Sequence, residues 1–282
     1  MNSSKQLKDL INNKAKKYNL NAQILLTRFF IERFLERISL SKYKNNFILK
    51  GGILISSIVG VDNRMTKDMD ITIKGLPLEE VFIRNTILDI IKTPVDDGTS
   101  FELIDLMIIR EEFDYSGFRA RLLAKLDKTQ NVIQLDITTG DTITPREINW
   151  SYNLLLEDRN IDIVCYPVET ILAEKIESIL SKNIATTRMK DFYDCYVLYN
   201  FYNKELNYQV LSNALHGTVV TRQTESIYSN TKRILELIKE NEQLKFLWLA
   251  YSSQFDYAKD IKYNELYKVL ETILVKLNLV KE

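Results

Sequence analysis

The sequence predicts an α+β fold in which a domain with a mixed sheet, residues 1–165, is followed by an all-helical domain, residues 166–282. In the first part, runs with the two-residue alternation of strands are interspersed with runs of helical spacing. Beyond Pro167, apolar residues recur almost everywhere at the spacing of three and four that is typical of helices. Hydrophobic residues make up 45% of the 282 residues, which is enough for a sizeable core.

Two helices are expected between residues 3 and 40, the second over residues 21–40 with charged residues such as Glu32 and Arg37 among its apolar positions. Short or alternating apolar runs then predict strands, and longer periodic runs predict helices. In order, we expect a strand at 47–50, a helix at 52–60, a strand at 68–74, a helix at 78–92, strands at 101–111, 115–127 and 131–141, and a strand at 161–167. Further helices are expected at 168–182, 188–202 and 208–217, with three more helical segments up to residue 282.

The composition limits the classes of function. Lysines and arginines number 38, as do aspartates and glutamates, so an RNA or DNA partner would need a local basic patch. Two cysteines, Cys165 and Cys195, and one histidine, His216, predict neither a disulfide framework nor a zinc site. The charged N-terminus lacks the apolar core of a signal peptide, and no run of roughly 18 to 20 apolar residues predicts a membrane span. We therefore expect a soluble, cytoplasmic protein that makes no membrane contact.

Two aspartates share one face of the strand expected at 68–74. Because residues two apart in a strand point the same way, Asp68 and Asp70 lie opposite their apolar neighbours. Neighbouring carboxylates repel each other by up to about 1 kcal/mol, and a divalent cation would offset this repulsion. Oxygen ligands shared with substrate phosphates suit Mg²⁺. The alternative is a solvated face on which Arg64 or Lys67 supplies the counter-charge.

Gly51 and Gly52 stand between the strand expected at 47–50 and the helix that follows it. A helix entered directly from a strand exposes backbone N–H groups at its first turn, and such groups favour an anion such as phosphate. The alternative is a tight turn that needs a positive φ. The two interpretations are compatible with each other.

A third carboxylate, Asp136, fits the same set. In the strand expected at 131–141, Leu135 and Ile137 point to the face opposite Asp136, which makes it a candidate third metal ligand or base. Two metals about 4 Å apart, bridged by these carboxylates, would activate an attacking hydroxyl and stabilise a leaving pyrophosphate. Taken alone, Asp136 would be an ordinary polar strand residue.

Two helices of the second part carry charged residues next to apolar ones. Lys175 lies on an apolar stripe, where a lysine usually extends its charged end to water and gains interest only if it reaches a phosphate. In the next helix, Arg188 and Asp191 lie opposite the apolar face, with Asp194 beside them. They form either a solvated face with a weak ion pair or, since Cys195 shares that face, a partly buried one.

Arg119, Arg121 and Lys125 share one face of the strand expected at 115–127. Such a stripe of cations is a candidate surface for a phosphate backbone. The alternative is the solvated face of an edge strand.

The chain resembles the AbiEii/AbiGii nucleotidyltransferase toxins of bacterial abortive-infection and type IV toxin–antitoxin systems. The features that carry this resemblance follow one another in order: KGG, RMTKDMD, a later lone strand aspartate, ETILAEKIESI and RMKDFYD. The resemblance covers roughly residues 45–200 and rests on the order and spacing of these features together. It implies a DNA polymerase β-like nucleotidyltransferase fold followed by a helical domain.

The resemblance also implies roles for particular residues. The catalytic residues would be Asp68, Asp70, Lys175 and Asp191, with Asp68 and Asp70 binding Mg²⁺ and Asp136 as the third candidate ligand. The residues expected at the nucleotide are Gly51, Gly52, Ser56, Arg188, Lys190 and Asp194. Many polymerase β-like enzymes have Gly-Ser where this chain has two glycines, so a serine hydroxyl that could hold a phosphate is missing there. Ser56 and Ser57 lie one turn further on, and Ser56 is the candidate named above.

The implied function is Mg²⁺-dependent transfer of nucleotides from an NTP, with GTP binding included, to an RNA 3′ end, tRNA in particular. A 3′-hydroxyl would attack the α-phosphorus, pyrophosphate would leave, and growth would stop. The family implies a separately encoded antitoxin, and a stable complex with it is not predicted. Two alternatives stay open: an NTP-binding toxin that modifies a protein acceptor, and a non-catalytic NTP-binding interaction module.

Overall fold

The computed structural model describes residues 3–110 and 116–281, which form two compact units. The first unit comprises Met1–Asp141 and Glu147–Cys165, and the second comprises Thr142–Arg146 and Tyr166–Glu282. The units thus divide after Cys165, while the short segment 142–146 is grouped with the helices. The assignment of residues 1–165 and 166–282 to two domains stays a prediction.

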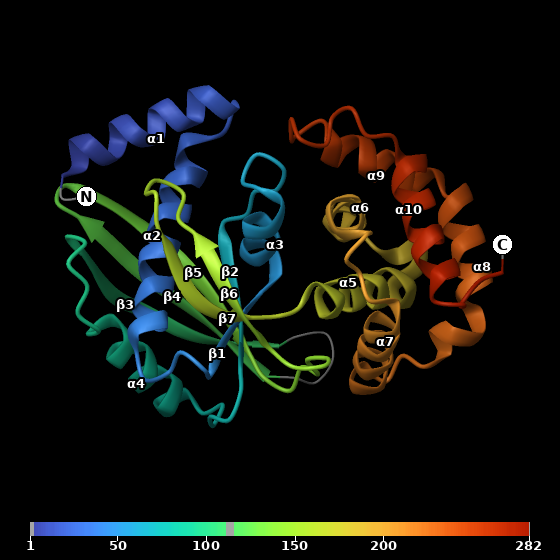
Figure 1. Ribbon diagram of the computed structural model, residues 1–282, viewed down its shortest axis with the longest axis horizontal. Helices are drawn as coiled ribbons and strands as arrows, with labels where there is room; N and C mark the ends of the chain where they lie inside the picture. The colour runs from blue at the N-terminus through green and yellow to red at the C-terminus, as the bar shows by residue number, and fades with distance from the viewer. Residues whose placement is uncertain (1–2, 111–115, 282) are drawn as a thin grey trace. The chain divides into compact units, whose positions relative to one another are not determined.

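The first unit contains a mixed seven-stranded sheet with the order β3-β4-β5-β2-β1-β7-β6 (Figure 1). Its strands are β1 (Phe47–Lys50), β2 (Asp68–Ile73), β3 (Thr99–Arg110), β4 (Ser116–Leu126), β5 (Thr129–Thr138), β6 (Ile148–Asn153) and β7 (Asn160–Cys165). The pairs β1–β7 and β2–β5 are parallel, and the other neighbours are antiparallel. Residues 111 and 115, expected at strand ends, lie outside the described residues.

The strand β6 was not expected from the sequence. Its sequence, INWSYN, alternates apolar and polar residues as half-buried strands do, although only Tyr152 of the six is buried. It forms one edge of the sheet and pairs with β7 alone. The strand was therefore detectable from the alternation of its side chains.

The described residues of the first unit form the helices α1 (Ser4–Tyr18), α2 (Ala22–Leu40), α3 (Gly51–Val59) and α4 (Glu80–Ile91). The helix α2 begins where the Asn21 side chain accepts hydrogen bonds from the backbone N–H groups of Gln23 and Ile24, as N-cap residues do. It packs against β5 and β7, while α4 packs against β3 (Figure 1). Inward side chains of the central strands, such as Met69 and Leu135, are fully buried.

The charged residues of α2 are buried, although their spacing along the helix does not distinguish them from a solvated face. They are Arg28, Glu32, Arg33, Glu36 and Arg37. Arg37 donates hydrogen bonds of 2.8 and 3.0 Å to the Asp97 carboxylate and one of 2.9 Å to the Thr99 carbonyl. A buried charge is tolerated when it is paired and hydrogen-bonded in this way.

The second unit is helical. It contains α5 (Val168–Lys182), the short 3₁₀ helix η1 (Asn183–Ala185), α6 (Met189–Tyr202), α7 (Tyr208–Arg222), α8 (Ser226–Glu240), α9 (Glu242–Ser252) and α10 (Tyr263–Lys276). The helix expected to end at Gly217 continues to Arg222, because a tertiary contact outweighs the low helix propensity of glycine. A Cβ on Gly217 would lie 2.9 Å from the Thr142 side chain. Over the described residues, none of the helices has the length and apolarity needed to cross a bilayer.

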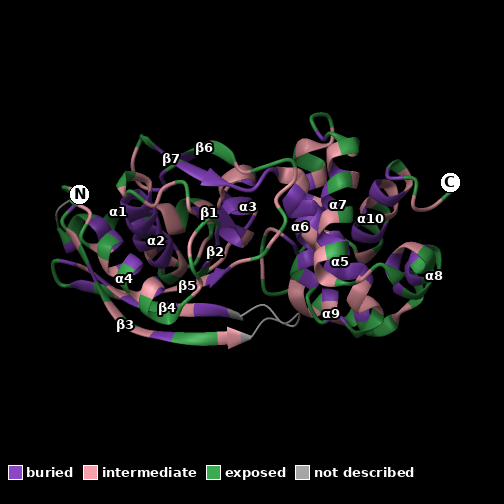
Figure 2. Ribbon diagram, turned by 90° about the horizontal axis from the view of Figure 1, so that it is seen from below, coloured by how far each residue is buried: buried purple, intermediate pink, exposed green. Residues whose placement is uncertain are grey.

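Each unit has its own core of buried residues (Figure 2). One cysteine belongs to each: Cys165 ends β7 in the first unit, and Cys195 lies on α6 in the second. Both side chains are buried. Burial raises the pKa of Cys165 to about 12 and that of Cys195 well above its ordinary value.

Replacing Asp97 by alanine should destabilise the protein by roughly 3 kcal/mol, because it leaves the buried Arg37 without its carboxylate partner. The two side chains are only 5% and 4% exposed. The free energy of unfolding in urea measures the loss. The control is Glu80→Gln, which removes an exposed pair with Arg84 and should cost less than about 0.5 kcal/mol. Equal losses in the two variants would contradict a stabilising role for the buried pair.

Candidate active site

Four strands place charged residues in one row across the sheet. Asp70 of β2 is in register with Lys50 of β1 on one side and with Asp136 of β5 on the other. Asp136 is in turn in register with Arg119 of β4. Directly opposite residues on neighbouring strands have Cβ atoms about 4.5 to 5.5 Å apart. The row therefore consists of a cation, two carboxylates and a second cation, which we call the charge row.

Asp68 and Asp70 lie on the same face of β2, opposite their apolar neighbours, as the alternation predicts. Met69 and Ile71 are fully buried, whereas Asp68 is exposed and Asp70 is half-buried. Two carboxylates on one face, one of them open to solvent, fit Mg²⁺, which uses one or two protein carboxylates and completes its shell with water and phosphate oxygens. Within the described parts of the chain, no larger group of acidic, histidine or cysteine ligands is assembled for a metal.

The two glycines bring the first turn of α3 close to this face. Gly51 has φ +67°, and a Cβ placed on it would lie 2.6 Å from Cγ of Asp70. At Gly52 a Cβ would lie 2.9 Å from Cβ of Thr66. The helix follows β1 directly, and its N-cap residue, Lys50, makes no side-chain capping hydrogen bond. The N-terminus of α3 thus lies beside the Asp70 carboxylate because residue 51 has no side chain.

Ser56 does not lie at that N-terminus. It is further along α3, is 2% exposed, and its hydroxyl has no hydrogen-bond partner among the described residues. The hydroxyl of the adjacent Ser57 donates to the Leu54 carbonyl at 2.7 Å. A phosphate contact from Ser56 therefore stays a prediction, and it would require the side chain to become accessible.

Asp136 is held by a cation. The Arg119 guanidinium donates to both of its carboxylate oxygens, at 2.8 and 2.7 Å. Hydrogen bonding to Asp136, together with the nearby charges of Asp68 and Asp70, raises the pKa of Arg119 above its already high value. A metal ion at Asp136 would thus have to compete with a permanently charged arginine.

Two residues that the sequence did not single out, Lys50 and Asp141, lie at the other end of the charge row. The Lys50 ammonium is 2.6 Å from Oδ2 of Asp141, and both side chains are largely buried. Lys50 was detectable from its place directly before the glycine pair. Asp141 was not, because it follows β5 after Gly140, where a positive φ turns the chain and ends the alternation.

The stripe of cations on β4 is neutralised by partners. Arg119 pairs with Asp136, Arg121 with Asp105, and Lys125 with Glu102. The strand β4 lies between β3 and β5, so the expectation of an edge strand is wrong; β3 forms the edge. The stripe is therefore a face of paired charges rather than a basic patch.

A second cluster of predicted residues forms within the helical unit, between α5 and α6. The Lys175 ammonium lies 2.7 Å from Oδ1 of Asp191 and 3.4 Å from Oδ2 of Asp194. Oδ2 of Asp191 also accepts from the Ser178 hydroxyl at 3.2 Å and pairs with Arg188 at 3.0 Å. Lys190 lies on the same helix and is exposed. The face of α6 that carries Asp191 and Asp194 is buried rather than solvated.

Opposing influences set the charges of this cluster. Burial alone would lower the pKa of Lys175, but the neighbouring Asp191 and Asp194 raise it well above its ordinary value. Burial would likewise raise the pKa of Asp191, but Lys175 and Arg188 together lower it below the ordinary range. At neutral pH, Lys175 is therefore a cation and Asp191 an anion.

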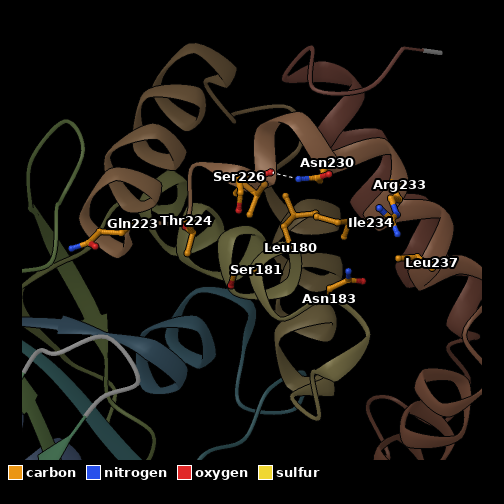
Figure 3. A pocket seen from close by; sticks show the side chains of 11 residues that line it. Leu180, Ser181, Asn183, Gln223, Thr224, Ser226, Asn230, Arg233, Ile234 and Leu237 are labelled. Atoms are coloured by element: carbon orange, nitrogen blue, oxygen red, sulfur yellow. Dashed lines mark hydrogen bonds between the residues drawn. The ribbon is translucent and has the colours of Figure 1, made fainter.

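A pocket of about 330 Å³ lies elsewhere in the helical unit, between the end of α5 and one side of α8 (Figure 3). It is lined by Leu180, Ser181, Asn183, Gln223, Thr224, Ser226, Ile227, Asn230, Arg233, Ile234 and Leu237. None of the predicted site residues is among them. Because its lining carries no carboxylate, the pocket offers no ligand set of the kind expected for Mg²⁺.

Comparison with protein families finds one that covers most of the chain. The family described as "Nucleotidyl transferase AbiEii toxin, Type IV TA system" matches residues 33–269, a span that includes both clusters of predicted residues. No curated protein matches the chain.

Solved structures share the fold at low sequence identity. MenT4, the nucleotidyltransferase toxin Rv2826c from Mycobacterium tuberculosis, is 11% identical with a TM-score of 0.54 over 98% of this chain and 99% of that chain. JHP933 from Helicobacter pylori is 17% identical with a TM-score of 0.52 over 92% of this chain and 95% of that chain. The similarity extends over both units, which supports the predicted α+β fold with its helical C-terminal part.

Replacing Gly51 by alanine should destabilise the protein more than the same change at Gly75. Both residues have positive φ, +67° and +70°, so each substitution carries a backbone cost of about 1 kcal/mol. A Cβ at Gly75 meets only Asn46, at 3.7 Å, whereas one at Gly51 would overlap the Asp70 carboxylate. That overlap should add about 1 to 3 kcal/mol. Unfolding in urea measures both, and equal losses would show that Asp70 does not pack against Gly51.

Replacing Lys175 by methionine should destabilise the protein by roughly 3 kcal/mol at pH 7, because Asp191 loses its ammonium partner in a buried site. In the wild type the lowered pKa of Asp191 adds stability above about pH 4, and this contribution is lost as the pH falls. In the variant the same carboxyl protonates more readily. The destabilisation should therefore shrink as the pH falls from 7 toward about 4.

Urea unfolding at the two pH values measures this change. The control is Lys204→Met, which removes an exposed lysine from the same unit and should have little effect at either pH. A Lys175→Met loss that does not change with pH would show that packing, rather than the ion pair, stabilises the site.

Proposed function

Because this chain belongs to the AbiEii nucleotidyltransferase toxins of type IV toxin–antitoxin systems, it is a nucleotidyltransferase that uses an NTP, and we propose that it transfers nucleotides to the 3′ end of an RNA, with tRNA as the first acceptor to test. The observation that carries this proposal is the contact between the first turn of α3 and Asp70. It brings anion-binding backbone N–H groups beside a carboxylate that fits a divalent cation. A nucleoside triphosphate with its cation offers the matching charges.

In this proposal, Asp68 and Asp70 hold Mg²⁺, and the backbone of Gly51 and Gly52 holds the triphosphate. Mg²⁺ bound there would neutralise phosphate charge and polarise the α-phosphorus toward an attacking 3′-hydroxyl, with pyrophosphate as the leaving group. Because Gly51 has no side chain, the first turn of α3 lies beside Asp70, so the triphosphate and its cation would be held next to each other. Asp136 becomes a third ligand only if Arg119 releases it.

The cluster of Lys175 and Asp191 is proposed to serve the same reaction as a fixed pair of charges. Because the pKa of Lys175 is raised, it would remain a cation able to pair with phosphate oxygens. The lowered pKa of Asp191 makes that carboxylate a weak base, so we assign it the positioning of Lys175 rather than proton abstraction. Arg188, Lys190 and Asp194 are proposed to support nucleotide binding around this pair.

The acceptor and the partner rest on the family. A type IV system implies an antitoxin, and we propose that it is separately encoded and acts without forming a stable complex with this chain. A protein hydroxyl as acceptor, and NTP binding without transfer, are the competing functions. The stripe on β4 does not favour RNA, because its cations are paired with carboxylates.

The test is to incubate the purified protein with total RNA, Mg²⁺ and each α-labelled NTP in turn. Label should enter RNA of tRNA size with at least one NTP. The Asp68→Ala/Asp70→Ala variant should lose this labelling, because it lacks both proposed metal ligands, and Lys175→Ala should lose most of it. The control is Asp162→Ala, which removes an exposed carboxylate from β7 in the same unit and should label RNA as the wild type does.

The outcomes separate the three functions. Label in protein and none in RNA would show that the acceptor is a protein side chain instead of an RNA 3′ end. Bound NTP with no transfer to any acceptor would favour the binding module. Labelling that survives in Asp68→Ala/Asp70→Ala would contradict the proposed site.

A further inference from the structure

Among the described residues, Asp141 is the common acceptor of at least three hydrogen-bond donors at the end of the charge row. Its Oδ2 atom lies 2.6 Å from the Lys50 ammonium, 2.6 Å from the Thr72 hydroxyl and 3.2 Å from the Thr138 hydroxyl. Thr72 and Thr138 are themselves in register on β2 and β5, and both are 2% exposed. The carboxylate is therefore held in one place by both central strands.

Lys50 lies next to a second carboxylate because of its position in the sheet. It ends β1 directly before α3, and its cross-strand partner is Asp70. The Lys50 ammonium also donates a hydrogen bond to the Asp141 carboxylate. The side chain is 11% exposed, so water screens its charge only weakly. How strongly the ammonium acts on Asp70 therefore depends on how far Asp141 neutralises it.

We propose that Asp141 is a positioning residue that sets the affinity of Asp68 and Asp70 for their divalent cation by holding and neutralising Lys50. With Asp141 in place, the positive charge of Lys50 is balanced outside the carboxylate pair. Without Asp141, the Lys50 ammonium interacts with the Asp70 carboxylate and competes with the metal ion for the same oxygens. This inference rests on the proposed function, because it assumes that Asp68 and Asp70 bind a cation.

The size of the effect follows from how cations act on carboxylates. An opposite charge within about 4 to 6 Å changes the proton affinity of a carboxylate about ten- to thousandfold. A divalent ion that competes for the same oxygens should lose at least about tenfold in affinity. Asp141→Asn keeps the shape of the side chain and an oxygen acceptor for the two threonines, so it removes mainly the charge.

The test measures Mn²⁺ binding to the protein without nucleotide or RNA, from the electron paramagnetic resonance signal of the free ion. Asp141→Asn should raise the dissociation constant about tenfold or more. Lys50→Met should leave it unchanged or lower it, because the competing ammonium is gone and Asp141 adds negative charge. The double variant Lys50→Met/Asp141→Asn should return it close to the wild-type value.

This pattern of signs separates the proposal from a structural role. If the ion pair served only to stabilise the sheet, Asp141→Asn and Lys50→Met would weaken Mn²⁺ binding alike, and that result would overturn the proposal. If Asp141→Asn alone does not fold, the comparison of Lys50→Met with the double variant still decides it, because both should then bind Mn²⁺ at least as tightly as the wild type. Weaker binding by both would contradict the proposed competition.

Two further measurements complete the design. The matched control is Glu147→Gln, which breaks the more exposed ion pair with Lys74 beyond the end of β2 and should not change the dissociation constant. Asp68→Ala/Asp70→Ala must abolish the binding. If the wild type shows no binding that depends on these two residues, the metal site of the proposed function fails and this inference fails with it. If the wild type does bind Mn²⁺ through these two residues, and Asp141→Asn binds Mn²⁺ as tightly as the wild type, only this inference fails.

Discussion

The pairing of β2 with its two neighbours is the constraint on which the charge row depends. Backbone hydrogen bonds join β2 antiparallel to β1 and parallel to β5, and they set Lys50, Asp70 and Asp136 side by side. Because side chains alternate along a strand, a slip of one residue would turn Asp68 and Asp70 into the core and Met69 and Ile71 into water. The burial of those apolar side chains therefore also keeps the carboxylates on the face of the proposed active site.

Buried charge is handled alike in three places. On α2, in the charge row and between α5 and α6, a cation is set among carboxylates. A neighbouring carbonyl accepts a hydrogen bond from the cation on α2, and a neighbouring hydroxyl donates to a carboxylate at the other two places. Removing one partner of such a buried pair lowers the stability of the protein by more than the intact pair contributes to it. The value of these pairs here is geometric, because each holds a charged atom in one position. Two of the three include residues assigned to the transferase reaction.

Apart from β6, the element order and the faces of the central strands could be predicted because they follow from local periodicity. The carboxylate pair of β2 is one example, and the lone Asp136 of β5 is another. Their partners could not be predicted. Arg119 lies 17 residues before Asp136, and only the register of β4 against β5 brings them together. Likewise, α2 looks half-solvated in sequence, because its covering residues, such as Asp97, are far away in the chain.

The placement of the two cysteines gives each compact unit its own chemical reporter. Only the thiolate reacts readily with alkylating reagents, and the raised pKa and burial of Cys165 and Cys195 keep both thiols unreactive while the protein is folded. Reaction at Cys165 therefore requires local opening of the sheet unit, and reaction at Cys195 requires opening of the helical unit. The rates of alkylation at the two positions thus distinguish units that open together from units that open one at a time.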